Sequence, residues 1–157
     1  MSATNQVEIR LAAERDIGAL LPLVDEYWRF EAIAGFDATR VAALLAQVLS
    51  EPALGRVWIA VVGGRPAGYL LAVFVFSLEY QGLTAEIDEL YVLPQYRNLG
   101  LGGKLLTVAE ATFRVHGCTN IALQIGRDND AARAFYRGHG YEGRAGFEMV
   151  GKHLQSN

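Results

Sequence analysis

The segment RNLGLGGK, residues 97–104, decides how the rest of the chain is interpreted. It combines an arginine, an asparagine, three glycines and a lysine within eight residues. A strand-like run, 87–93, precedes it and a helix-like run, 105–116, follows it. Because a glycine-rich turn at a helix start can present backbone N–H groups to an anion, this segment predicts a site for a phosphate-bearing ligand.

Two common phosphate-binding motifs fit this turn poorly. A P-loop needs a glycine where Asn98 stands and a Ser or Thr after Lys104, whereas Leu105 follows that lysine. The dinucleotide-binding fingerprint matches Gly100 and Gly102 but needs a third glycine where Leu105 stands. Both a nucleotide hydrolase and a dinucleotide-binding enzyme are therefore disfavoured.

The composition indicates an ordinary globular protein, and 157 residues predict a single domain over 1–157. With 14 basic and 17 acidic residues, the net charge of −3 disfavours a nucleic-acid partner. The lone cysteine, Cys118, excludes a disulfide within the chain. The start MSATNQVEIR lacks a signal pattern, and the longest apolar run, 69–76, is too short for a membrane span. We therefore expect a soluble, cytoplasmic protein.

Hydrophobic periodicity predicts an α+β fold, an α/β sandwich with helices on a mostly antiparallel sheet. The expected strands cover 7–12, 56–62, 67–78, 85–93 and 119–125, with one or two more within 141–154. The expected helices cover 14–34, 38–49, 102–116 and 128–140. The element order is then β-α-α-β-β-β-α-β-α-β-β. Asp128 or Asn129 is expected to cap the last helix, and Gly140 to end it.

Two segments, VLPQYRNLGLG at 92–102 and NDAARAFYRGHGY at 129–141, resemble the motifs of the GCN5-related N-acetyltransferase (GNAT) family. VLPQYRNLGLG, 92–102, resembles its pyrophosphate motif, Arg/Gln-x-x-Gly-x-Gly/Ala. NDAARAFYRGHGY, 129–141, resembles its later motif, Asn-x-x-Ala-x-x-Phe/Leu-Tyr-x-x-x-Gly-Phe. The resemblance covers nearly the whole chain and implies a GNAT fold of about seven strands and four helices. Asn98 stands where the family usually has Gly, and we expect the loop to survive because asparagine tolerates a left-handed backbone.

The resemblance also implies acetyl-CoA as co-substrate, with its diphosphate on the loop and the helix start. Arg97 and Lys104 would add positive charge, and the β-strand backbone before the loop would pair with the pantetheine arm like an added strand. No metal is expected, since the three histidines lack metal-ligand spacing. The implied cofactor-binding residues are Leu90, Tyr91, Val92, Arg97, Asn98, Leu99, Gly100, Leu101, Gly102, Gly103, Lys104, Asn129, Ala132 and Tyr136.

Direct acetyl transfer needs a base, because an alkylamine with a pKa near 10.4 is almost entirely protonated at pH 7. The segment AEIDEL, 85–90, offers Glu86, Asp88 and Glu89. Strict alternation puts Glu86 and Asp88 on one face of the strand and Glu89 on the other. The resemblance points to Glu86 and Asp88, but a bulge could swap the faces, so Glu89 stays a candidate.

Tyr136 is the candidate general acid, because the resemblance implies that its hydroxyl points at the cofactor sulfur; a core tyrosine is the alternative. An acyl intermediate on Cys118 is disfavoured, since the cysteine follows the far end of the helix 102–116. Segments 25–36, 77–82 and 144–147 are expected to select the acceptor, with Tyr27, Trp28, Phe36, Glu79 and Tyr80 as candidate cleft residues. Tyr27 and Trp28 could equally belong to the core.

The leading prediction is an acetyl-CoA-dependent N-acetyltransferase that acts on a primary amine of a small molecule or peptide. One alternative is a non-catalytic acyl-CoA-binding sensor. Another is a toxin-like acetyltransferase that acts on aminoacyl-tRNA, which the net charge disfavours. A homodimer is an open alternative, because dimers are frequent in this fold.

Overall fold

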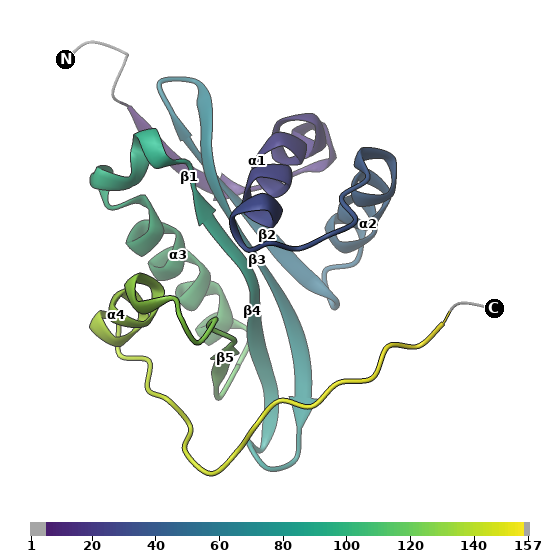
Figure 1. The fold of residues 1–157 in the computed structure, drawn as a ribbon, viewed down its shortest axis with the longest axis vertical. Coiled ribbons are helices and arrows are strands. Elements are labelled where there is room, and N and C mark those ends of the chain that lie inside the picture. The colour runs from purple at the N-terminus through teal and green to yellow at the C-terminus, as the bar shows by residue number, and fades with distance from the viewer. Residues whose placement is uncertain (1–5, 156–157) are drawn as a thin grey trace. The chain divides into compact units, whose positions relative to one another are not determined.

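A computed structural model describes residues 6–155, and the chain divides into two compact units between Gln124 and Ile125. The first unit is built on a five-stranded sheet of order β1-β2-β3-β4-β5 (Figure 1). The first four strands pair antiparallel, and β5 runs parallel to β4. The strands are β1 (Val7–Leu11), β2 (Gly55–Val62), β3 (Arg65–Ser77), β4 (Gly82–Val92) and β5 (Ile121–Leu123).

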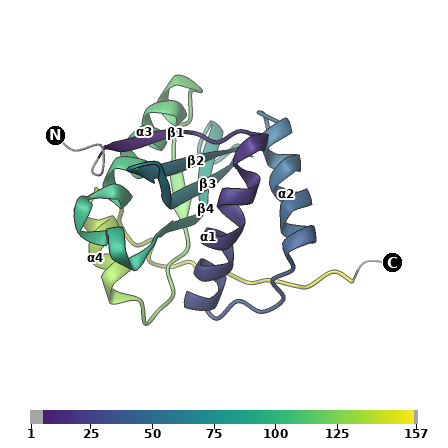
Figure 2. The same cartoon turned by 90° about the horizontal axis from the view of Figure 1, so that it is seen from above.

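Three α-helices cover the two faces of this sheet, with α1 and α2 on one face and α3 on the other (Figure 2). They are α1 (Ile17–Phe30), α2 (Ala38–Ser50) and α3 (Leu101–Val115), and two 3₁₀ turns, η2 (Glu14–Asp16) and η3 (Pro94–Leu99), precede α1 and α3. The core under α1 and α2 consists of Leu20, Leu23, Val24, Val41, Leu45, Val48, Val57, Ile59, Tyr69 and Tyr91. Under α3, Phe113 packs edge-on against Trp58 and Phe74.

The expected helices and the first five strands are confirmed, with shifts at their ends. The largest shift is in the first helix, expected over 14–34, which ends at Phe30. Ala32 is left-handed, with φ 55°, and the Ile33 N–H bonds back to the Trp28 carbonyl. This is the hydrogen-bond pattern of a Schellman end, so the helix stops where the backbone turns left-handed.

The strands expected within 141–154 are wrong, because residues 141–155 contain no strand. Within the described residues the sheet has five strands rather than about seven. The second unit, described by itself, consists of α4 (Asp130–Gly138) followed by an irregular segment. Four apolar side chains of this irregular segment are exposed, namely Phe147, Met149, Val150 and Leu154. Apolar alternation makes a strand only where a partner strand and a buried face are present, and neither is found in this segment. The single domain over 1–157 stays a prediction.

An ion pair between the half-buried Arg10 and the buried Asp16 links β1 to the start of α1. The Asp16 carboxylate accepts hydrogen bonds from both Nη atoms of Arg10, each at 2.8 Å, and from the Ala13 N–H at 2.7 Å. Asp16 is only 6% exposed. The hydrogen bonds from Arg10 lower the pKa of Asp16 to about 2, against the opposing effect of burial.

We expect Asp16→Asn to lower the free energy of unfolding at pH 7 by about 2 kcal/mol, which is the linkage value of this pKa depression. The folded-state pKa lies below the unfolded one, so this stability is present above pH 4 and is lost as the pH falls towards 2. Urea unfolding of both proteins at pH 7 and pH 3 measures the difference. A difference that stays constant across this range would contradict the assignment.

Candidate active site

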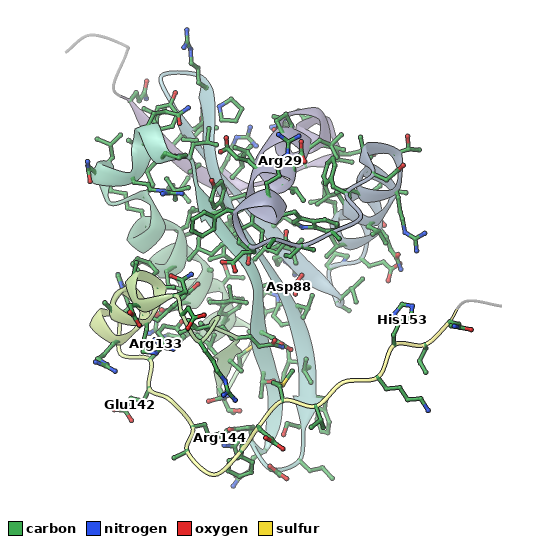
Figure 3. All side chains as sticks on the ribbon, in the orientation of Figure 1. Arg29, Asp88, Arg133, Glu142, Arg144 and His153 are labelled. Carbon is green, nitrogen blue, oxygen red and sulfur yellow. The ribbon has the colours of Figure 1, made fainter. Side chains whose placement is uncertain are left out.

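A β-bulge lies in the middle of β4, among the candidate carboxylates. Leu71 of β3 pairs with Glu89, and the next residue of β3, Ala72, pairs with Ile87. Asp88 is therefore the extra residue, without a partner in β3. Figure 3 labels Asp88 part-way along β4.

The bulge changes which carboxylates share a face. Glu86 pairs with Val73 and Glu89 pairs with Leu71. Directly paired residues lie on the same face, and Val73 and Leu71 share a face because they are two residues apart in one strand. Glu86 and Glu89 therefore share the face covered by α1 and α2. The expectation that Glu89 lies opposite Glu86 is wrong, because strict alternation does not count the extra residue.

Glu89 is held by two neutral donors from other elements. Its Oε2 accepts a hydrogen bond from Trp28 Nε1 in α1 at 2.8 Å, and its Oε1 accepts one from the Tyr69 hydroxyl in β3 at 2.8 Å. Burial raises the pKa of Glu89, and the two hydrogen bonds partly oppose this. Complete burial, together with the charge of Glu89, raises the pKa of Tyr69 far above its usual value. Tyr69 therefore stays protonated and acts as a donor.

The carboxylates of this strand have no cationic partner among residues 6–155. No Lys, Arg or His side chain of that part forms an ion pair with Glu86, Asp88 or Glu89. Asp88 is exposed in the bulge, and its partial removal from water raises its pKa. The site therefore keeps uncompensated negative charge close to α1, which suits a cationic ligand.

The glycine-rich segment forms η3, a left-handed residue and the start of α3. Gly100 has φ 71° and ψ 21°, and the first helical hydrogen bond runs from the Lys104 N–H to the Gly100 carbonyl at 3.1 Å. The N–H groups of Leu101, Gly102 and Gly103 precede that bond and have no helical acceptor. Leu101 is fully buried, which anchors the start of the helix. Lys104 is exposed one turn along.

Asn98 does not need the left-handed tolerance that we expected of it. Among the described non-glycine residues, only Ala32 and Gln81 have a positive φ. Asn98 lies within η3, and the left-handed position is taken by Gly100. The departure from the family motif at position 98 therefore leaves the backbone of the turn intact. Both Asn98 and its neighbour Leu99 are exposed.

The edge of β4 leading to the turn lies open on its β5 side. β5 pairs only with Ala85, Glu86 and Ile87, so within residues 6–155 no strand pairs with the segment 88–92 on that side. Leu90 is half-buried opposite Leu70, Tyr91 is buried, and the Val92 carbonyl accepts a hydrogen bond from Arg97 Nε at 3.1 Å. An extended ligand arm could pair with this edge.

The later motif builds α4 and its two ends. The Asn129 side chain accepts a hydrogen bond from the Ala132 N–H at 3.0 Å, so Asn129 rather than Asp128 is the cap. At the other end the Gly140 N–H bonds to the Arg137 carbonyl and the Tyr141 N–H to the Tyr136 carbonyl, which is a Schellman motif. Tyr136 is 9% exposed and packs edge-on against Phe135 and Tyr141.

We expect Gly140→Ala to destabilise α4 by about 1–2 kcal/mol, because Gly140 has φ 91° and a Cβ disfavours the left-handed region. No atom lies within 4 Å of the added Cβ, so the cost is conformational. Gly138→Ala is the matched control. It adds a methyl group inside the helix, also without a neighbour within 4 Å, and should stabilise α4. Hydrogen exchange of the α4 amides measures both; equal effects of the two variants would contradict this role of Gly140.

Three of the candidate cleft residues pack against the core, and their role in selecting the acceptor stays a prediction. Tyr27, Trp28 and Phe36 are partly buried against the cluster under α1 and α2, although Trp28 also donates a hydrogen bond to Glu89.

Burial raises the pKa of the half-buried Cys118 thiol, which disfavours the thiolate that an acyl intermediate needs. Within residues 6–155, no group of three or more His, Cys, Asp or Glu side chains could hold a metal ion.

Three residues near the site were not predicted from the sequence: Tyr69 of β3, and Phe30 and Glu26 of α1. Tyr69 contacts Glu89 through its hydroxyl, Phe30 contacts Arg97, and Glu26 accepts a hydrogen bond from the Tyr91 hydroxyl at 3.3 Å. Phe30 and Glu26 lie within the segment 25–36, which was expected to select the acceptor, so this expectation could have pointed to them. None of the helices described between residues 6 and 155 is long and apolar enough to cross a bilayer.

The comparison with known families agrees with both motifs. The family model described as "Acetyltransferase (GNAT) family" matches residues 20–141, which include the carboxylate strand, the glycine-rich turn and α4. The chain belongs to the GNAT family. It is therefore an acyltransferase of the N-acetyltransferase type, and the GNAT fold predicted from the two motifs is confirmed, with a five-stranded sheet in the described residues. Members of this family use acetyl-CoA.

Individual GNAT relatives are similar over most of the chain. An uncharacterized N-acetyltransferase, YhfO of Bacillus subtilis, is 29% identical over 90% of this chain and 93% of its own. The thialysine N-epsilon-acetyltransferase of Bos taurus is 26% identical, over 93% of this chain and 98% of its own. Among solved structures, the integron cassette protein HFX_CASS3 from the Cole Harbour salt marsh metagenome has a TM-score of 0.83 at 26% identity, covering 95% of this chain and 91% of that chain.

Proposed function

We propose that this protein transfers the acetyl group of acetyl-CoA directly to a primary amine of a small cationic molecule or peptide, in the cytoplasm. The observation that carries the proposal is the bulged strand β4. It combines three carboxylates that have no cationic partner in the described part of the chain with an open edge that leads to a glycine-rich helix start. The names of relatives that act on thialysine support an amine acceptor.

The residues before and within the turn suit acetyl-CoA. The segment 93–104 has no acidic residue and carries Arg97 and Lys104, and three N–H groups at the start of α3 have no helical acceptor. These groups would hold the diphosphate, and the backbone of Leu90, Tyr91 and Val92 would bind the pantetheine arm. When bound, acetyl-CoA supplies the activated acetyl thioester.

The carboxylates of β4 would bind and deprotonate the acceptor. The ammonium form is attracted to the negative charge at Glu86, Asp88 and Glu89, and one carboxylate accepts a proton. The neutral nitrogen would then form the C–N bond as the C–S bond breaks, and the departing thiolate would take a proton from the Tyr136 hydroxyl. The new amide nitrogen would lose its surplus proton to solvent, from which the Tyr136 oxygen would recover its own. We assign the base role to Glu89, because Trp28 and Tyr69 hold both of its oxygens without neutralising its charge.

A direct transfer should give intersecting initial-rate lines when acetyl-CoA and amine are varied together, because both must be bound before product leaves. The measurement starts with a panel of polyamines, aminoglycosides, lysine analogues, amino acids, peptides and aminoacyl-tRNA, with free CoA as the readout. Parallel lines together with an acetylated Cys118 would contradict direct transfer. Tight CoA binding without turnover on any amine would instead support the sensor alternative.

A further inference from the structure

The last residue of α1, Phe30, lies against the first cation of the glycine-rich turn. The guanidinium carbon of Arg97 is 5.5 Å from the centroid of the Phe30 ring and 5.5 Å from that of the Tyr91 ring. The two rings are themselves 5.8 Å apart. Arg97 therefore lies over two aromatic rings, one from α1 and one from β4, within cation–π distance of both.

A hydrogen bond adds a third restraint on the same guanidinium. Arg97 Nε donates to the Val92 carbonyl at 3.1 Å. The two Nη atoms carry four further N–H groups. Arg97 also interacts with the Tyr91 hydroxyl, and no ion pair within residues 6–155 involves its guanidinium. The guanidinium is thus held by the Val92 carbonyl and by Tyr91, and its remaining N–H groups stay available to an anion.

The two rings differ in how far they serve the core. Tyr91 is 6% exposed, belongs to the core cluster and donates its hydroxyl to Glu26 of α1. Phe30 is 57% exposed and lies outside that cluster. Because an exposed ring contributes little to the core, packing does not account for the position of the Phe30 ring against Arg97.

We infer that Phe30, with Tyr91, is a positioning residue that holds Arg97 ready for the diphosphate of acetyl-CoA. This inference rests on the proposed function. A long arginine side chain loses rotamer freedom when it binds an anion, and a guanidinium already held on two rings and one carbonyl loses less. Because α1 also carries Trp28, the partner of Glu89, one helix supports both the cofactor turn and the carboxylate that faces the acceptor.

Calorimetry of CoA binding to four variants tests this inference. Phe30→Leu keeps an apolar side chain but removes the ring, and should weaken CoA binding by about two- to fivefold. Phe30→Tyr keeps the ring and should bind like the wild type. Arg97→Ala should weaken binding by about ten- to a hundredfold, because it removes a charge-assisted contact. In the double variant, Phe30→Leu should have no further effect.

Phe76→Leu is the matched control, since it makes the same change at an exposed position of β3 and should leave CoA affinity unchanged. Wild-type affinity in Phe30→Leu, or an equal loss with and without Arg97, would overturn the inference and leave the proposed function standing. Wild-type affinity in a folded Arg97→Ala variant would instead overturn the assignment of the turn to CoA, and with it the proposed function.

Discussion

Replacing Glu89 by Gln is expected to lower kcat/KM for the amine by about 10²–10⁴-fold, the usual contribution of a general base. The amide cannot accept a proton from the ammonium. Burial raises the pKa of the wild-type carboxyl, and Glu89 must be ionised to act, so the wild-type rate should rise with pH through that pKa. The variant should lose this limb, so its defect should be largest between the pKa of Glu89 and that of the amine, where the wild-type carboxyl is ionised and the amine still has to be deprotonated.

Glu86→Gln is the matched control for Glu89→Gln, because Glu86 lies on the same face of β4 without the hydrogen bonds from Trp28 and Tyr69. Glu86→Gln should lower kcat/KM by a smaller factor than Glu89→Gln does, and so should Asp88→Asn in the bulge. Steady-state rates from pH 6 to pH 9 rank the three variants. A larger defect in Glu86→Gln or Asp88→Asn would move the base role to that residue. CoA affinity and circular dichroism check that each variant is folded. This matters most for Glu89→Gln, because the amide NH2 group cannot accept a hydrogen bond and leaves either Trp28 or Tyr69 without an acceptor.

Replacing Tyr136 by Phe should lower kcat by about 10²-fold and leave CoA affinity nearly intact, because only a hydroxyl is lost. We expect the low end of the range for a general acid, since water can also protonate the thiolate. The hydroxyl acts in its protonated form, so the wild-type rate should fall at high pH as it ionises. The variant should lack this basic limb.

Tyr141→Phe is the control for Tyr136→Phe, because it removes a hydroxyl from the ring that packs edge-on against Tyr136. Its kcat and pH profile should match the wild type. Pre-steady-state release of CoA separates the chemical step from product release in both variants. A Tyr136→Phe enzyme with wild-type kcat and pH profile would leave Tyr136 as a core residue of the second unit.

Those features of the site that depend on nearby residues could be predicted from the sequence. The glycine-rich turn before α3, a cap for α4 at Asp128 or Asn129, and its end at Gly140 were all expected. The structure puts the left-handed residue at Gly100 and not at Asn98, and the cap at Asn129. Each depends on hydrogen bonds or backbone angles within about five residues. Periodicity likewise predicted the α-helices and the first five strands, because the apolar pattern of an element follows its own geometry.

What only the tertiary structure decided involves residues far apart in the chain. The bulge at Asp88 follows from the pairing of β4 with β3, and it moves Glu89 to the face of Glu86. Trp28 reaches Glu89 across 61 residues of sequence, and Phe30 reaches Arg97. The apolar alternation of 141–154 predicted strands that are not found in the described residues. Strand register, a bulge and contacts between elements depend on which partner each residue meets, and a pattern within one segment carries no information about that partner.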